Sequence, residues 1–251
     1  GVKIQGLTLK HALSTDNGGN GQVYRIWFDN TLHDGRGGSG QGTIEGGFTE
    51  KYMTGSEIIE FARGPIGFLL VEKVIERDMW SQAYHSDQHV RYSKTFRING
   101  GSNIGHMGPD GLPEHPDITF QNIAENVAFV NVEVYDAQGD EEGSGAQSIF
   151  YQGGTYRKDQ LFKNVIFIGG NNYWQVKNLE HIIIKDSILA GPIALGLYDP
   201  VIMKNVLIEG NILNSVINSK TGPEVRPWEE TLAEWSGAFK NNHYTCTNCG
   251  E

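Results

Sequence analysis

The stretch YHSDQHVRYS places four side chains with acid–base or ion-binding chemistry at every second position: His85, Asp87, His89 and Arg91. If the stretch is one strand, alternate side chains point to opposite faces and these four stand in a row. Such a row can bind an anionic sugar, with Arg91 contacting a carboxylate or sulfate, a His or the Arg acting as base, and Asp87 orienting an imidazole. The alternative is a solvent-exposed strand face that has no functional role. A metal shared by His85 and His89 is disfavoured, because residues i and i+4 of a strand are roughly 13 Å apart.

A second candidate is the acidic segment DAQGDEE, Asp136–Glu142, which carries four carboxylates in seven residues. Carboxylates this close repel one another unless they are solvated or bind a cation, and calcium prefers such oxygen ligands. The spacing is not that of an EF-hand, and we expect Asp136, Asp140 and Glu142 as ligands if calcium binds. Asp136 and Asp140 could instead form the acid and base of a glycoside hydrolase. A solvated acidic turn explains the same residues.

Two further segments hold weaker candidates for sugar contacts. Tyr198 can stack on a sugar and Asp199 can bond its hydroxyls, although a turn before Pro200 also accounts for both. His106 lies in a Gly/Pro-rich loop, where a histidine is usually just exposed.

The chain ends with the pattern H-x-x-C-x-x-C, formed by His243, Cys246 and Cys249. These are three possible zinc ligands, but a structural zinc site needs a fourth. We therefore favour a Cys246–Cys249 disulfide or a free tail. The body of the chain contains no cysteine, which suits an extracellular protein.

The composition limits the classes of fold and partner. The chain has 251 residues, enough for one large domain, and its 33 glycines indicate a turn-rich, all-β architecture. The net charge of -10 disfavours nucleic acid and anionic membranes as partners. Apolar runs are too short for a membrane span. There is neither an initiator Met nor a signal-peptide pattern, so we expect a processed, truncated or excised piece.

A repeated pattern sets the expected fold. Five segments align without gaps, each an apolar, often β-branched strand with a polar kink, and their starts lie 20, 18, 17 and 24 residues apart. One such coil cannot bury its own apolar face, whereas stacked coils bury a continuous core. Asn and Gly at the kinks fit the positive φ of a sharp corner. The segments are Asn126–Val134, Ala146–Gly154, Asn164–Asn172, His181–Leu189 and Asn205–Leu213, and Gly1–Leu9 has the same shape.

These segments resemble coils of right-handed parallel β-helix proteins, a superfamily that includes pectate-lyase-like enzymes, polygalacturonase-like hydrolases and phage tailspikes. The resemblance implies a single right-handed parallel β-helix over residues 1–219, with coils of roughly 17–24 residues, and a C-terminal cap and cysteine-containing tail over 220–251. It also implies a polysaccharide ligand and an extracellular, cell-surface or virion location. The NTD, DD and GHG motifs and the Arg-x-Pro-x-x-Arg pattern are missing, so no catalytic residue carries over by motif.

The two ends of the expected solenoid differ. Pro223–Phe239 has Trp228, Leu232 and Trp235 at helical spacing, which predicts a short amphipathic helix that covers the open end. At the other end the strand pattern begins at Val2 without a cap. We therefore expect removed coils, a second copy or another chain there.

Two functions remain open from the sequence. The first is recognition or cleavage of an extracellular polysaccharide, by elimination at a uronic acid or by hydrolysis with paired carboxylates. The second is a non-enzymatic structural or adhesive β-helix, such as a phage tail or fibre segment or a surface filament subunit.

Overall fold

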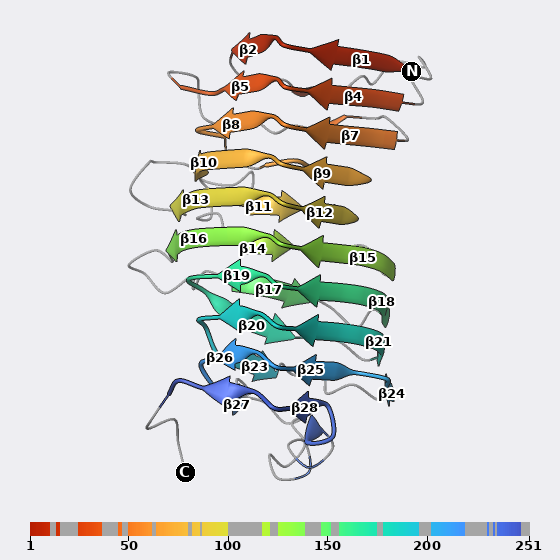
Figure 1. Cartoon of the computed structure of the whole chain (residues 1–251), viewed down its shortest axis with the longest axis vertical. Helices are drawn as coiled ribbons and strands as arrows, with labels where there is room; N and C mark the ends of the chain where they lie inside the picture. Colours follow the sequence, from red (N-terminus) through yellow and green to blue (C-terminus); the bar gives the residue numbers. More distant parts are fainter. Residues whose placement is uncertain are drawn as a thin grey trace, which may run out of the picture.

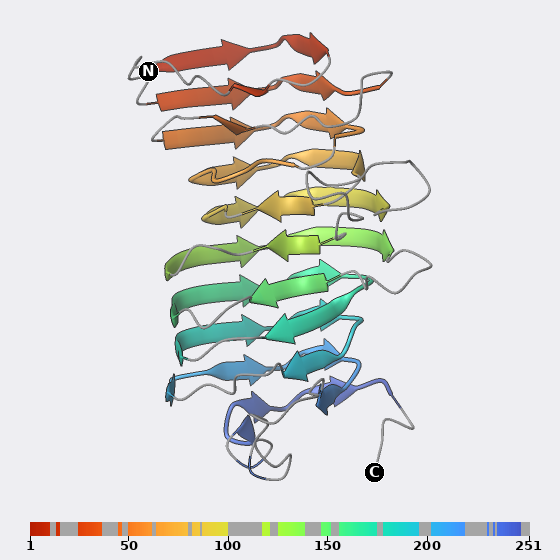
Figure 2. The same cartoon turned by 180° about the vertical axis from the view of Figure 1, so that it is seen from behind.

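The computed structural model describes residues 1–10, 14–15, 25–36, 45–46, 50–61, 64–79, 82–85, 87–99, 117–120, 125–138, 147–151, 156–174, 178–195, 202–218, 230, 233 and 235–246. They form three long parallel sheets and one short two-stranded sheet, and the long sheets stack into a solenoid. In Figure 1 the near strands run to the left and the far strands to the right while the chain advances downward, which is a right-handed winding. Figure 2 shows the far sheet in front. The expected parallel β-helix is confirmed.

Most coils contribute one strand to the first sheet and the next strand to the second. The first sheet consists of β1 (Val2–Gln5), β4 (Arg25–Asp29), β7 (Glu50–Thr54), β9 (Leu70–Glu72), β12 (His89–Arg91), β15 (Glu125–Val130), β18 (Tyr156–Lys163), β21 (Asn178–Lys185), β25 (Leu207–Glu209) and β28 (Phe239–Lys240), with β24 (Ile202–Lys204) also paired to β21. The second consists of β2 (Thr8–Lys10), β5 (Leu32–Asp34), β8 (Glu57–Ile59), β10 (Ile75–Met79), β13 (Lys94–Asn99), β16 (Glu133–Gln138), β19 (Ile166–Phe167), β22 (Ile188–Leu189), β26 (Ile212–Leu213) and β29 (His243–Tyr244).

The third sheet lies on the far side of Figure 1. It consists of β11 (Gln82–His85), β14 (Asp117–Phe120), β17 (Gln147–Tyr151), β20 (Asn171–Trp174), β23 (Ile193–Leu195) and β27 (Val216–Asn218). The two-stranded sheet pairs β3 (Ser14–Thr15) with β6 (Glu45–Gly46).

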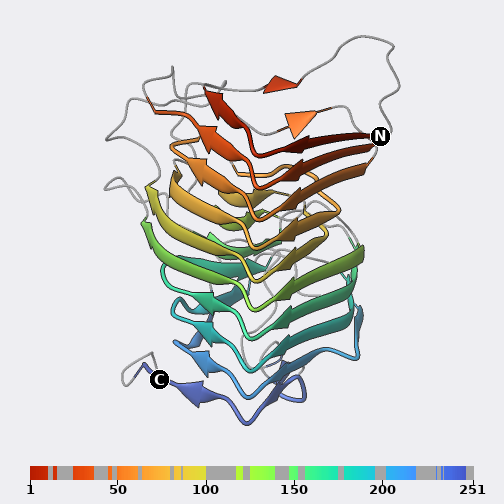
Figure 3. The same cartoon turned by 45° about the horizontal axis from the view of Figure 1, so that its top comes forward.

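A two-residue corner joins the first sheet to the second in every coil, and Figure 3 shows these corners stacked in one line. The first residue of each corner has a left-handed φ between 50° and 68°, a region that favours Gly, Asn and Asp. These residues are Gly6, Asn30, Gly55, Lys73, Tyr92, Asn131, Asn164, Asp186, Gly210 and Asn241. The expectation of Gly and Asn at the kinks therefore holds for most corners.

The second corner residue often satisfies a backbone group of the preceding coil. The side-chain oxygen of Ser56 accepts a hydrogen bond from the amide of Thr31 at 3.1 Å. Ser93 accepts from the amide of Val74, also at 3.1 Å. A buried amide without a partner would destabilise the corner, so these hydroxyls help to stack the coils. Ser56 thus lies in the corner before β8.

The core is a set of inward columns that run through the coils. In the first sheet one continuous register column is Ile4, Phe28, Met53, Val71, Val90, Phe129, Phe162, Ile184, Ile208 and Phe239. Phe129 and Phe162 stack with ring centroids 5.2 Å apart. Each inward side chain fills the space above the next, so the core is continuous along the axis.

The repeat was aligned correctly only in part. Strand pairing makes Asn126, Asp159 and His181 equivalent, because Val127, Gln160 and Ile182 are register partners. Asn164–Asn172 starts instead at a corner, and Ala146–Gly154 covers β17 of the third sheet. A short apolar run with a polar kink occurs several times in one coil, so a short match does not fix the phase. Coils also vary more than expected, with corner residues 18 (Gly55 to Lys73) to 39 (Tyr92 to Asn131) positions apart.

An aromatic contact in the core joins the C-terminal segment to an earlier coil. Trp235 is buried and packs edge to face on Trp174, with ring centroids 5.5 Å apart. The backbone of Glu230, Ala233 and Trp235 is helical. Trp228 and Leu232 lie outside the described residues. At the other end, β1 and β2 are edge strands, and the Val2 side chain is about half exposed.

Candidate functional site

The row expected in YHSDQHVRYS does not form, because the chain turns inside it. His85 ends β11 in the third sheet, whereas His89 and Arg91 lie in β12 of the first sheet. The strand alternation therefore does not run through all four residues. The His85 side chain lies outside the part of the chain that the structure describes.

Asp87 sits in the turn between these strands and is fully buried. Its Oδ1 accepts a hydrogen bond from the backbone amide of Phe68, one coil earlier, at 2.7 Å. A buried carboxylate that closes a turn contributes to the fold, so the expected role of Asp87 in an outward row is wrong. His89 and Arg91 do face outward and are exposed.

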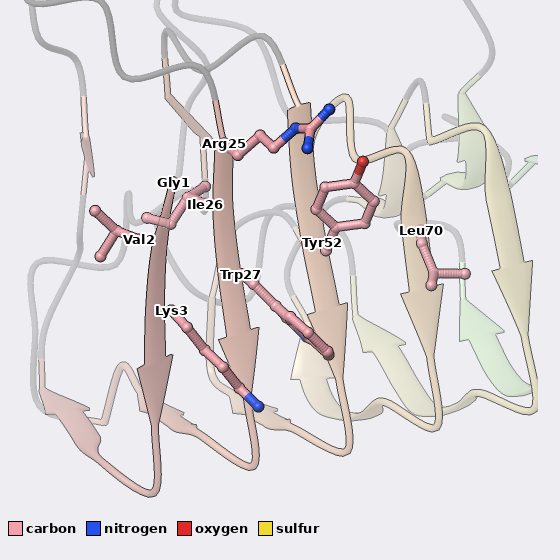
Figure 4. Close-up of a pocket in the computed structure, with 8 residues that line it drawn as sticks. All are labelled: Gly1, Val2, Lys3, Arg25, Ile26, Trp27, Tyr52 and Leu70. Carbon is pink, nitrogen blue, oxygen red and sulfur yellow. The ribbon is translucent and has the colours of Figure 1, made fainter.

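Those two residues belong to a larger feature, which we call the first-sheet groove. Two hollows on the outward face of the first sheet share Tyr52 and Leu70, so they adjoin. One has a volume of about 470 Å³ and is drawn in Figure 4. It is lined by Gly1, Val2, Lys3, Arg25, Ile26, Trp27, Tyr52 and Leu70. The other has a volume of about 540 Å³ and is lined by Tyr52, Leu69, Leu70, Gln88, His89, Val90, Arg91, Ala128 and Val130.

The groove crosses the strands along the solenoid axis. Register pairing sets Lys3, Trp27, Tyr52, Leu70, His89 and Ala128 in one outward row over six consecutive strands of the sheet. Neighbouring strands lie ~4.8 Å apart, so the row is roughly 24 Å long. Figure 4 shows Lys3, Trp27 and Tyr52 on the same face of adjacent strands.

Trp27 forms the centre of the first hollow and is held by a chain of polar contacts. Its Nε1–H donates to Thr54 Oγ1 at 2.8 Å, and that hydroxyl donates to Asp29 Oδ1 at 2.8 Å. Lys3 Nζ lies 2.8 Å from Asp29 Oδ2 and 4.3 Å from the centroid of the indole ring. The indole remains 41% exposed. It therefore offers apolar surface to solvent in a fixed orientation.

Tyr52 lies beside Trp27 and is held in a similar way. Its hydroxyl donates to Glu50 Oε2 at 2.9 Å, and this hydrogen bond raises the phenol pKa. Arg25 Nε lies 2.5 Å from the same carboxylate, and the hydrogen bond from Arg25 lowers the pKa of Glu50. The phenol is therefore neutral and Glu50 ionised near neutral pH.

At the other end of the groove, Arg91 Nε is 3.3 Å from Glu72 Oε1 on the preceding strand. His89 pairs in register with Leu70 and Ala128, and the small Ala128 side chain leaves space beside the imidazole. This end of the groove therefore offers a ligand hydrogen-bond donors and apolar surface, and the charge of Arg91 is paired with that of Glu72.

Trp27, Tyr52, Lys3 and Arg25 were missed by the sequence reasoning. A signal was available: in RIWFD, Arg25–Asp29, the tryptophan alternates with the buried Ile26 and Phe28, which predicts an outward ring. An exposed tryptophan on a strand is a better indicator of a binding surface than a row of charges.

The acidic candidate is only partly described. Asp136 is exposed near the end of β16, with a left-handed φ of 62°. It lines a separate hollow of about 280 Å³ on the second sheet, together with Arg77, Asp78, Phe96, Arg97 and Tyr135. Asp140 and Glu142 lie outside the described residues, so the calcium site and the acid–base pair stay predictions. Among the residues that are described, no group of three His, Cys, Asp or Glu is arranged for a metal.

Most of the remaining candidate residues lie outside the described part of the chain. His106, Tyr198 and Asp199 lie outside the described residues. Cys246 is disulfide-bonded, which agrees with the favoured alternative and excludes it as a zinc ligand. Cys249 lies outside the described part.

Comparison with known proteins gives no relative. No protein-family model, no curated protein and no solved structure matches this chain. In the part of the chain that is described, no helix is long and apolar enough to cross a membrane.

Proposed function

We propose that this chain binds an extended extracellular polysaccharide along the first-sheet groove. The observation that carries the proposal is the exposed, pinned indole of Trp27 beside Tyr52 in a hollow that crosses successive coils. Aromatic rings with one apolar face and a wet rim suit pyranose rings, which have apolar faces and hydroxyl edges.

The shape of the groove supports a polymer. Two adjoining hollows extend along the axis, and one strand spacing is close to the length of a pyranose residue. A linear glycan lying along the axis would therefore meet an equivalent position on each coil.

The groove supports binding better than cleavage. Hydrolysis needs one carboxyl to give a proton and a second to act as base or nucleophile. Asp29, Glu50 and Glu72 beside the groove are each paired to a cation, and Glu50 and Asp29 have lowered pKa values because of those hydrogen bonds. Asp29 and Glu50 are therefore not suited to donate a proton. We propose an adhesive or binding β-helix.

The disulfide at Cys246 supports an extracellular place of action, because disulfides persist in oxidising compartments.

The test is a binding assay of the purified chain on immobilised polysaccharides, with Trp27→Ala as the probe. Ile183→Ala is the matched control, because Ile183 has the same register position two strands beyond Ala128 and is 36% exposed. We expect Trp27→Ala to weaken binding roughly tenfold and Ile183→Ala to leave it unchanged. Equal binding by wild type and Trp27→Ala, both folded, would contradict the proposal.

A further inference from the structure

From the charges around the first-sheet groove we infer that its ligand is a neutral, hydroxyl-rich polysaccharide rather than a polyuronate or a sulfated glycan. This inference rests on the proposed function and adds the substrate class. It also replaces our expectation from the sequence, in which Arg91 contacted an anionic group of the sugar.

Among the described residues that line the groove, the lysine and the two arginines each have a carboxylate partner on a neighbouring coil. Lys3 pairs with Asp29 at 2.8 Å, Arg25 with Glu50 at 2.5 Å, and Arg91 with Glu72 at 3.3 Å.

Two of these carboxylates also have further hydrogen bonds that hold them in place. Asp29 accepts from Thr54, and Glu50 accepts from Tyr52. A sugar carboxylate could reach Lys3 or Arg25 only by displacing a held anion or by approaching close to it. Two like charges this close repel each other, and more strongly near a protein surface than in bulk water.

The net charge of the whole chain also disfavours an anionic ligand. Its net charge is -10, with a sequence pI near 5.3. A polyanion therefore meets an unfavourable field before it reaches the groove, whereas a neutral chain does not.

Paired charges are well suited to hydroxyl groups. An ionised carboxylate accepts from a sugar O–H, while an ammonium or guanidinium beside it donates to the next oxygen. The pairs Lys3–Asp29 and Arg25–Glu50 lie close to Trp27 and Tyr52, so a pyranose stacked on a ring would present its hydroxyl edge to both signs of charge.

The experiment compares polymers that differ only in charge. The panel contains a glucan, a mannan and a galactan, each beside its C6-oxidised counterpart, which carries a carboxylate on the same backbone. Affinity is measured at about 50 mM and about 500 mM salt, because screening separates ionic from neutral recognition. We expect at least one neutral polymer to bind roughly tenfold more tightly than its oxidised form, with little dependence on salt.

Two failures can be distinguished. Tighter binding of an oxidised polymer that weakens with salt and is lost in Trp27→Ala would overturn the neutral-ligand inference and leave the proposed function standing. No binding to any of the six polymers by the folded chain would contradict both.

A variant that removes two of the carboxylates tests independently whether the paired charges set the preference for a neutral polymer. Asp29→Asn combined with Glu72→Gln leaves Lys3 and Arg91 without their carboxylate partners, so the variant should gain affinity for an oxidised polymer. If the variant and the wild type discriminate equally between neutral and oxidised forms, the paired charges do not set specificity.

Discussion

The outward face of the first sheet has two halves that share a backbone and differ in their side chains. From β1 to β12 the outward row reads Lys3, Trp27, Tyr52, Leu70 and His89, and from β18 to β25 the same row reads Leu161, Ile183 and Leu207. Strands accept aromatic and aliphatic residues alike at such positions. The fold therefore does not require the two aromatic rings, which supports a functional reason for them.

The interior shows a parallel difference. In the inward column of the second sheet the first half contains His33, Glu76 and Thr95, while the second half contains Val134, Phe167 and Leu189. Glu76 Oε2 accepts from Thr95 Oγ1 at 2.9 Å, and the Thr95 hydroxyl is 3.2 Å from that of Tyr84. Within this column the buried polar groups thus lie in the half that carries the groove, and we expect the stability of that half to depend more on pH.

The largest expected effect is on binding. Replacing Trp27 and Tyr52 together by alanine should weaken polysaccharide binding roughly a hundredfold, because each ring contributes about 1–1.5 kcal/mol of contact. The matched change in the other half, Ile183→Ala with Leu207→Ala, should leave affinity unchanged. Isothermal titration calorimetry of the two double variants and the wild type would measure these affinities. An equal loss of affinity in both double variants would contradict a functional difference between the two halves.

The next effect concerns His33, which is buried with Nε2 2.9 Å from Thr31 Oγ1. Burial lowers the pKa of His33 to about 4, so the unfolded chain binds the extra proton first as the pH falls. The stability that His33 contributes as a neutral group is therefore lost between about pH 6.5 and about pH 4, by at most about 3 kcal/mol.

Denaturant unfolding across this pH range would measure the loss. His33→Leu should remove most of the pH dependence, because leucine does not bind a proton. Leucine also fits the site, since the register partners Leu9 and Ile58 are aliphatic. Phe167→Leu, in the same column of the other half, is the control and should keep the wild-type profile. A His33→Leu variant with an unchanged profile would exclude this histidine as the source.

A third prediction has the opposite sign with pH. Burial raises the pKa of Glu76 well above its usual value, with the charge of Asp87 adding to the rise and the hydrogen bond from Thr95 opposing it. The folded chain holds the proton, so stability is present below the ordinary glutamate pKa of about 4.3 and is lost as the pH rises through the folded value. Glu76→Gln keeps the shape and cannot ionise.

We therefore expect Glu76→Gln to match the wild type at about pH 4 and to be more stable at about pH 9. Thermal unfolding at both pH values would show it. A parallel decline of both proteins with pH would mean that Glu76 is not held protonated.

The smallest expected effect concerns the support of the indole. Thr54→Val removes the acceptor for Trp27 Nε1 and the donor to Asp29. One such hydrogen bond is worth about 1 kcal/mol, so affinity should fall about fivefold. Thr54→Ser keeps the hydroxyl and should bind like the wild type, and if both variants bind alike the hydroxyl does not position the ring.

The fold could be predicted from the sequence because its two requirements are local. Strands need short apolar runs, and corners need residues that tolerate left-handed backbone, as at Asn131, Asn164 and Gly210. Lys73 and Tyr92 occupy the same left-handed corners, and their residue types give no such signal. The phase of the repeat failed for the same reason, since one coil contains several strands of similar pattern.

The site could not be predicted because it depends on pairing between coils. Alternation in RIWFD marks Trp27 as outward, but it does not show that Tyr52, 25 residues later, is its register partner. Conversely, alternation across YHSDQHVRYS was misleading, because the segment has no Gly or Pro and its one signal for a turn is the pair Ser86-Asp87, which was assigned to a strand.

The stacked left-handed corners keep the coils at a regular spacing along the axis. Because each corner returns the chain to the same geometry, adding or deleting one whole coil shifts the later strands by a single spacing and leaves the others paired. If the groove binds a polysaccharide as proposed, the number of coils between Lys3 and Ala128 sets how many sugar units the surface can contact at once. Gain or loss of whole coils would therefore change the length of polymer that is bound, while the residue types that make each contact stay the same.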